Sequence, residues 1–80
     1  MTQVGTVNHY YDKIGVAIVK LDKPVKVGDT LRFGGEENGF NQEVTSMQMN
    51  HEAYPAAKKG DEVGIKVDQK AKEGTPVSLP

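Results

Sequence analysis

Glycine and proline interrupt this chain so often that few stretches remain in which a helix could form. Nine of the 80 residues are glycine and four are proline, and both residue types mark turns. The stretches between them are rich in Val, Ile and Thr, which lose rotamer freedom in helices and pack well on pleated sheets. The pattern therefore predicts an all-β protein made of short strands joined by turns.

The apolar residues place the strands. The clearest strand signal is 14–21, which is apolar on both faces and so is expected to be buried on both sides. Along 40–50 the parity changes, because Gln42 and Val44 share one face with Phe40 while two methionines take the other, which predicts a bulge or bend near Thr45-Ser46. The six predicted strands are 3–8, 14–21, 30–33, 40–50, 63–67 and 76–79, with 34–39 as an exposed loop tip.

An open sheet this small would carry two exposed edges and would leave half of its apolar residues on a wet face. We therefore expect the six strands to close into an antiparallel-type β-barrel with Greek-key elements. At 80 residues the chain has room for one domain, which we expect to span 1–80.

A short pattern recurs before the strands. Gly28-Asp29 and Gly60-Asp61 each precede a predicted strand, and Gly74-Thr75 is a looser third copy. Gly-Asp at such a place predicts a tight turn in which the aspartate side chain binds local backbone amides.

Composition mainly limits the function. The absence of cysteine excludes disulfides, thiolate metal sites and cysteine nucleophiles. Ten basic and eleven acidic residues give a net charge of −1, which removes the simplest argument for nucleic-acid binding. There is no membrane-spanning apolar run, secretory signal or phosphate-binding loop. The chain is therefore expected to be cytoplasmic, with no bound nucleotide triphosphate and no cofactor.

Ordered motifs along nearly the whole chain resemble a known domain. They are Val-Gly-Thr-Val at 4–7, Ile-Gly-Val-Ala-Ile-Val-Lys-Leu at 14–21, Val-Lys-Val-Gly-Asp-Thr-Leu at 25–31, Val-Thr-Ser-Met-Gln at 44–48 and Ala-Lys-Lys-Gly-Asp-Glu-Val-Gly-Ile-Lys-Val at 57–67. The set resembles the second, β-barrel domain of translational GTPases such as elongation factor Tu. It is similar also to the C-terminal barrels of collagenase-like peptidase-family proteins, some of which modify RNA. With Met1 close to the first strand, the chain looks like a stand-alone version.

The resemblance implies a closed six-stranded barrel of the translation-protein type and a link with translation or RNA metabolism. It does not carry over the pocket for the aminoacyl end of tRNA. The threonine and asparagine that line that pocket in the family align roughly with Ile18 and Glu62 here. A buried isoleucine cannot donate a hydrogen bond, and a carboxylate repels a nucleic-acid terminus.

His9, Tyr10, Tyr11 and Lys13 are the first candidate binding residues. They fall in a predicted hairpin loop, where two aromatic rings and cationic groups could stack on an unpaired base and contact phosphate. The alternative is a structural role in which the tyrosines cover one end of the barrel.

Lys66, Lys70 and Lys72 are the second candidate group. They could contact phosphates if they project together, but four acidic residues lie in the same third of the chain. The alternative is that these lysines simply keep strand faces solvated.

Metal binding and catalysis find little support. His9 and His51-Glu52 make a poor zinc set without cysteine, and no carboxylate is placed to orient a Ser46–His51 pair. Met47 and Met49 form a stripe that is expected to pack in the core, with a methionine-lined peptide groove as the alternative. We therefore predict that the protein is not an enzyme.

Two functions remain open. The leading hypothesis is a non-catalytic binding module that docks RNA or the ribosome through one barrel face. The alternative is a protein–protein interaction adaptor, which supplies in trans the barrel that peptidase-like or RNA-modifying relatives carry in cis. The near-neutral charge favours the adaptor.

Overall fold

A computed structural model describes residues 2–35, 39–49 and 52–79 of the chain. These residues form ten strands, so the prediction of an all-β protein is confirmed. The strands are β1 Thr2–Tyr11, β2 Val16–Leu21, β3 Val25–Lys26, β4 Thr30–Phe33, β5 Phe40–Glu43, β6 Met47–Met49, β7 Glu52–Tyr54, β8 Ala56–Ala57, β9 Glu62–Lys66 and β10 Pro76–Leu79. Within the same residues, no helix has the length and apolar character needed to cross a membrane.

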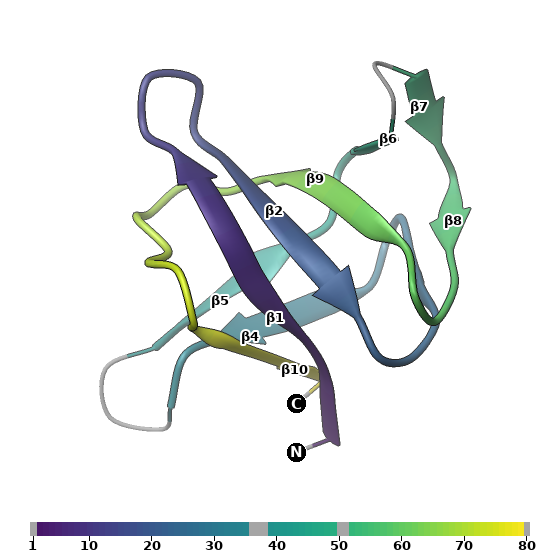
Figure 1. Cartoon of the computed structure of the whole chain (residues 1–80), viewed down its shortest axis with the longest axis horizontal. Coiled ribbons are helices and arrows are strands. Elements are labelled where there is room, and N and C mark those ends of the chain that lie inside the picture. Colours follow the sequence, from purple (N-terminus) through teal and green to yellow (C-terminus); the bar gives the residue numbers. More distant parts are fainter. Residues whose placement is uncertain (1, 36–38, 50–51, 80) are drawn as a thin grey trace.

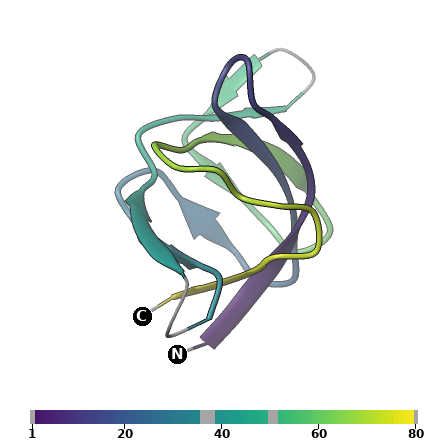
Figure 2. The same cartoon turned by 90° about the vertical axis from the view of Figure 1, so that its left-hand side faces the viewer.

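Eight strands make one antiparallel sheet in the order β5-β4-β10-β1-β2-β9-β6-β7 (Figure 1). The sheet curls around the core, but β5 and β7 are left as free edges. The expected closed six-stranded barrel is therefore wrong, and the fold is an open, curled half-barrel. Thr2 pairs with Leu79, so the two ends of the described chain lie together, at the end opposite the β1–β2 turn (Figures 1 and 2).

Two smaller features cover the open sides of the sheet in place of a closing ladder. The chain turns at Pro55 from β7 into β8, and β8 pairs with β3 as a separate two-stranded ribbon. The segment 67–75 crosses the other opening (Figure 2) and buries Val67 and Ala71 against the core. The backbone N–H of Asp68 donates to Gln42 Oε1 at 2.8 Å, which ties this segment to β5.

The core is formed by the inward residues of the curled sheet. Phe33, Leu21, Leu31, Met47 and Ile65 are the largest side chains that are fully buried. Four partly buried residues pack against this core, namely Tyr10, Phe40, Met49 and Leu79. Met47 and Met49 thus pack in and against the core, as predicted.

The strand predictions differ from the structure at two places. Segment 40–50 is two strands, because β5 pairs with β4 while β6 pairs with β9, and the chain bends at 44–46 as expected. Segment 14–21 is not buried on both sides, since Ile14 lies exposed in a turn and Val16 and Ile18 are only half-buried. The predicted loop residues 36–38, and Asn50, lie outside the described residues.

The repeated Gly-Asp turns have the predicted chemistry. Asp29 Oδ2 accepts the Lys26 N–H at 3.1 Å, and Asp61 Oδ2 accepts the Lys58 N–H at 3.0 Å. Gly28 and Gly60 have φ values of 101° and 92°, a conformation that glycine adopts without a steric cost. The Gly74 turn is similar, with φ of 86°, although threonine replaces the aspartate there.

Replacing Asp61 with alanine should lower the free energy of unfolding by about 1 kcal/mol, because the Lys58 N–H loses its charged acceptor. Urea denaturation measures the effect. Asp22→Ala is the matched control, since the exposed Asp22 carboxylate accepts no hydrogen bond within the described part of the chain. Equal unfolding midpoints for the two variants would show that the turn does not depend on the side chain.

Candidate docking surfaces

The β1–β2 hairpin projects from the end of the molecule farthest from the termini (Figures 1 and 2). Its turn is closed by hydrogen bonds from the Ile14 and Gly15 N–H groups to Tyr11 O, at 3.3 and 2.9 Å. Tyr11 and Ile14 are 48% and 57% exposed. Together with Val27, they are the large apolar side chains that stay exposed among the described residues. The hairpin therefore presents apolar surface to solvent.

This surface continues along the outer face of the sheet. Tyr11 pairs with Val16, and His9 pairs with Ile18. Directly paired residues of antiparallel strands point to the same side, so these four side chains share one face. We call this set, with the turn residue Ile14, the hairpin face: His9, Tyr11, Ile14, Val16 and Ile18.

Gly64 of β9 keeps the hairpin face flat. It pairs with Ile18, and a Cβ added at Gly64 would lie 3.1 Å from Val16 Cγ1 and 3.4 Å from Ile18 Cδ1. The two β-branched side chains therefore occupy the space beside the glycine. Any side chain at this position would raise a ridge along the β9 side of the apolar strip.

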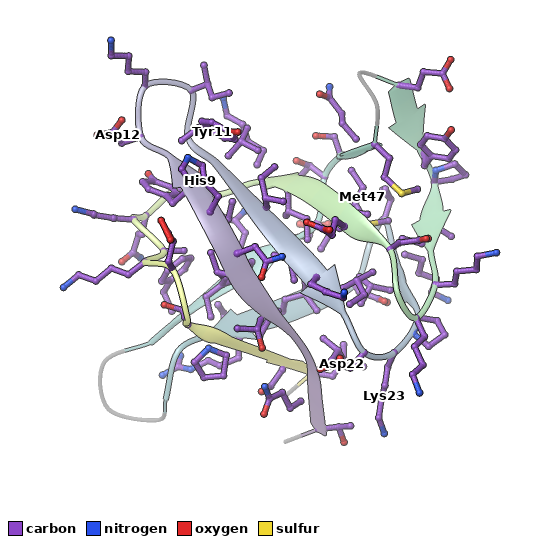
Figure 3. All side chains as sticks on the ribbon, viewed as in Figure 1. His9, Tyr11, Asp12, Asp22, Lys23 and Met47 are labelled. Atoms are coloured by element: carbon purple, nitrogen blue, oxygen red, sulfur yellow. The ribbon has the colours of Figure 1, made fainter. Side chains whose placement is uncertain are left out.

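The histidine and tyrosine of this face are held against each other (Figure 3). Their ring centroids are 4.3 Å apart with an interplanar angle of 63°, which is an edge-to-face contact. His9 Nδ1 also lies 3.5 Å from Glu73 Oε2. Both partners of that pair are at least half exposed, so the pair adds little to stability.

Tyr10 lies on the opposite side of β1 from this pair. It packs against the core and lines a surface hollow of about 440 Å³ together with Asp12, Lys70, Lys72 and Glu73. Two lysines and two acidic residues therefore share this hollow, and their charges cancel.

The structure thus divides the seven candidate residues predicted from the sequence between two places. His9, Tyr11, Lys13 and Lys66 lie at the hairpin, where the Lys66 Nζ donates to Ile14 O at 3.3 Å and Lys13 is exposed in the turn. Tyr10, Lys70 and Lys72 lie at the hollow. The two tyrosines do not act as a pair, because they alternate across a strand rather than sharing a loop.

Sequence reasoning missed Ile14, Val16 and Ile18 as surface residues. The sequence did contain a sign of this exposure. Segment 14–21 is apolar on both faces, and a domain this small has one core, which can bury only one of them. Ile18 is half-buried on the hairpin face rather than inside the protein. Glu62 is the second residue that differs from the tRNA pocket of the elongation-factor family. It accepts a hydrogen bond from Asn8 Nδ2 at 3.2 Å.

Some of the residues considered for metal binding or catalysis lie outside the residues that the structure describes. The described part of the chain contains no group of three or more His, Asp or Glu side chains that could hold a metal ion. Ser46 is exposed between β5 and β6, and His51 lies outside the described residues.

Three comparisons with known proteins bear on this fold and site. No family model matches the chain. An uncharacterized protease of Methanocaldococcus jannaschii is 40% identical over 78 residues, which are 96% of this chain and 19% of that protein. The chain therefore spans about a fifth of the length of the curated relative that it matches.

Two similar solved structures are crystal structures of the C-terminal domain of a Geobacillus thermoleovorans protein described as a U32 peptidase. They superpose with TM-scores of 0.90 and 0.89 at 22% identity. The alignments cover 99% and 98% of this chain, and 92% and 99% of the two crystallised chains. They establish the fold and agree with the resemblance to C-terminal barrels of peptidase-family proteins. The finer resemblance to the elongation-factor domain finds no support in them and stays a prediction.

Proposed function

We propose that this domain is a non-catalytic docking module that binds a peptidase-like protein through the hairpin face. The observation that carries the proposal is the exposure of Tyr11 and Ile14 beside half-buried Val16 and Ile18. Exposed apolar side chains gathered on one face mark interaction sites. Tyrosine is also among the residues that most often dominate the energy of an interface.

The size of the molecule fits a single docking face. The accessible surface is 4982 Å², and a standard interface takes about 800 Å² from each partner, or about a sixth of this surface. The curled outer face of β1, β2 and β9 is a contiguous area on which such an interface can form. Because the net charge is only −1, apolar contact rather than long-range attraction would supply most of the affinity.

The relatives supply the class of partner. The region that matches this chain is a fifth of the M. jannaschii protein, so the other four-fifths lie beside the equivalent barrel in one polypeptide. The proposed adaptor makes in trans a contact of the kind that the relative can make in cis.

RNA or ribosome docking remains a prediction with weaker support. The predicted lysines do not form one patch, since Lys66 lies at the hairpin while Lys70 and Lys72 share a hollow with Asp12 and Glu73. At the second place, the two carboxylates offset the attraction of the two lysines for a polyanion. If tRNA bound the domain at low salt more tightly than the protein partner does, this order of preference would be reversed.

The direct test is calorimetric titration of the purified domain into the M. jannaschii protein from which the matching fifth has been removed. We expect binding, and we expect the double variant Tyr11→Ala, Ile14→Ala to bind about tenfold or more weakly, because both side chains lose their buried contact. Val27→Ala is the matched control, since Val27 is also an exposed apolar residue but lies beside the β3–β8 ribbon. Unchanged binding by the double variant would contradict the proposal.

A second measurement covers the case in which the shortened relative does not fold. Hydrogen exchange is compared between the intact relative and its isolated barrel. The strands equivalent to β1 and β2 should exchange more slowly in the intact protein, because the hairpin face is covered there. Equal exchange rates in the two proteins would rule out the proposed contact.

A further inference from the structure

A second hollow, of about 320 Å³, lies between the segment 67–75 and the β4–β5 strands. The segment that forms one wall is the one that crosses the opening of the half-barrel in Figure 2. We call it the phenylalanine hollow. Its side chains come from Phe33 and Phe40 on one side and from Lys70, Lys72, Thr75 and Pro76 on the other.

The floor of this hollow is aromatic. The rings of Phe33 and Phe40 are stacked with centroids 5.3 Å apart and an interplanar angle of 6°. Phe33 is fully buried, while Phe40 is half-buried. Ala71 and Pro76 complete an apolar lining. An apolar group that enters would therefore find a preformed surface.

Within the described part of the chain, the charged side chains that line the hollow are Lys70 and Lys72. Neither Lys70 nor Lys72 makes an ion pair or side-chain hydrogen bond among the residues that the structure describes, and no Asp or Glu of those residues lines the hollow. On the facing rim, a Cβ added at Gly35 would meet nothing within 4 Å, and the Gly35 carbonyl accepts hydrogen bonds from Arg32 Nη2 at 3.2 Å and from the Gly39 N–H at 3.1 Å. Among the described residues the site thus combines an apolar floor with two lysines that make no ion pair, although Asp12 and Glu73 lie on the other side of these lysines.

We propose that the phenylalanine hollow binds the C-terminal end of a peptide. The terminal carboxylate lies between Lys70 and Lys72, and an apolar last side chain rests on Phe40. The hollow is at the small end of ligand pockets, which hold about 300–1,000 Å³, so it fits one residue rather than a long ligand. This site is separate from the hairpin face and does not depend on what binds there.

The neighbouring hollow decides between a peptide and a nucleic acid. Lys70 and Lys72 also line the hollow of Tyr10, where Asp12 and Glu73 lie. A nucleic-acid strand carries a negative charge at every phosphate and would run past these carboxylates. A peptide carries one terminal charge, and a basic residue upstream would meet Asp12 and Glu73 favourably.

The test is a nuclear magnetic resonance titration of the labelled domain with the pentapeptide Ala-Lys-Ala-Ala-Phe in two forms, one with a free carboxylate and one amidated. The free acid should shift the amide signals of Gly34, Gly35 and Ala71. The amidated form should bind about tenfold more weakly, because it lacks the charge that the lysines recognise.

The double variant Lys70→Gln, Lys72→Gln should bind the free acid about tenfold more weakly and should no longer distinguish it from the amide. Lys58→Gln, Lys59→Gln is the matched control, because these exposed lysines lie in the β8–β9 turn outside the hollow, and it should bind as the unaltered domain does. Equal binding of acid and amide, no shift at millimolar peptide, or tighter binding of a five-nucleotide RNA at the same amides would each overturn the proposal.

Discussion

Gly5→Ala should destabilise this domain by about 3 kcal/mol, as expected for adding atoms to a tightly packed site. A Cβ at this position would lie 2.5 Å from Lys20 O and 2.9 Å from Val19 Cγ1. The carbonyl belongs to the neighbouring strand β2, and Gly5 pairs with Leu21 there and with Val77 of β10. Neither neighbour can move away without breaking hydrogen bonds in the centre of the sheet.

Gly35→Ala is the matched control, because a Cβ there meets open space and the backbone is not in the left-handed region. The measurement is the urea midpoint of unfolding for both variants. For a chain of 80 residues the total stability is about 4–12 kcal/mol, so the Gly5 variant should lose a large part of it. Midpoints that coincide would mean that the strands can separate locally at little cost.

Phe33→Ala should cost about 3–5 kcal/mol, which is the usual effect of removing a buried aromatic ring. Phe33 is 1% exposed and heads the fully buried side chains in size. Its ring also stacks on Phe40, so the substitution removes both core packing and the partner of the second ring.

Thermal unfolding checks this prediction, since each 1 kcal/mol lowers the midpoint by about 4–8 °C in a domain of this size. Phe40→Ala serves as the comparison, because Phe40 is only half-buried and its removal should cost clearly less. A larger loss for Phe40 than for Phe33 would show that the stacked pair, rather than the core below it, carries the stability.

Local features of the fold could be predicted from the sequence because nearby residues determine them. Gly28-Asp29 and Gly60-Asp61 form the expected turns, since a glycine conformation and an aspartate acceptor are sufficient for them. The bend at 44–46 follows from a parity change that is visible in the residues themselves.

Whether the sheet closes could not be predicted correctly from the sequence, because closure depends on pairing between distant segments. Pro55 turns the chain from β7 to β8, and β8 then pairs with β3 instead of extending the main sheet. The cost of two exposed edges argued for closure, but the structure keeps β5 and β7 as edges, and the β3–β8 ribbon and the segment 67–75 pack against the core instead.

Where the candidate residues lie could be predicted in part, while their role in binding stays a prediction. His9 and Tyr11 do lie together at an exposed place. Tyr10 does not join them, because β1 extends to Tyr11 and successive side chains of a strand point to opposite sides. A register shift between Val7 and His9 then determines which of these side chains face inward. Because Tyr10 and Tyr11 are adjacent and both aromatic, the alternation of apolar residues does not tell which of them faces inward, so the side of each tyrosine is known only from the fold.

The pairing of Thr2 with Leu79 places both ends of the described chain at one end of the domain. A chain joined to either end would leave from the same pole, and the hairpin would point away from it. Reporter proteins fused before or after the domain should therefore leave partner binding equally undisturbed. A flexible linker attached at that end would also let the hairpin take up many orientations around the attachment point. The hairpin could then meet a neighbouring protein at a high local concentration, without a fixed interface near the chain ends.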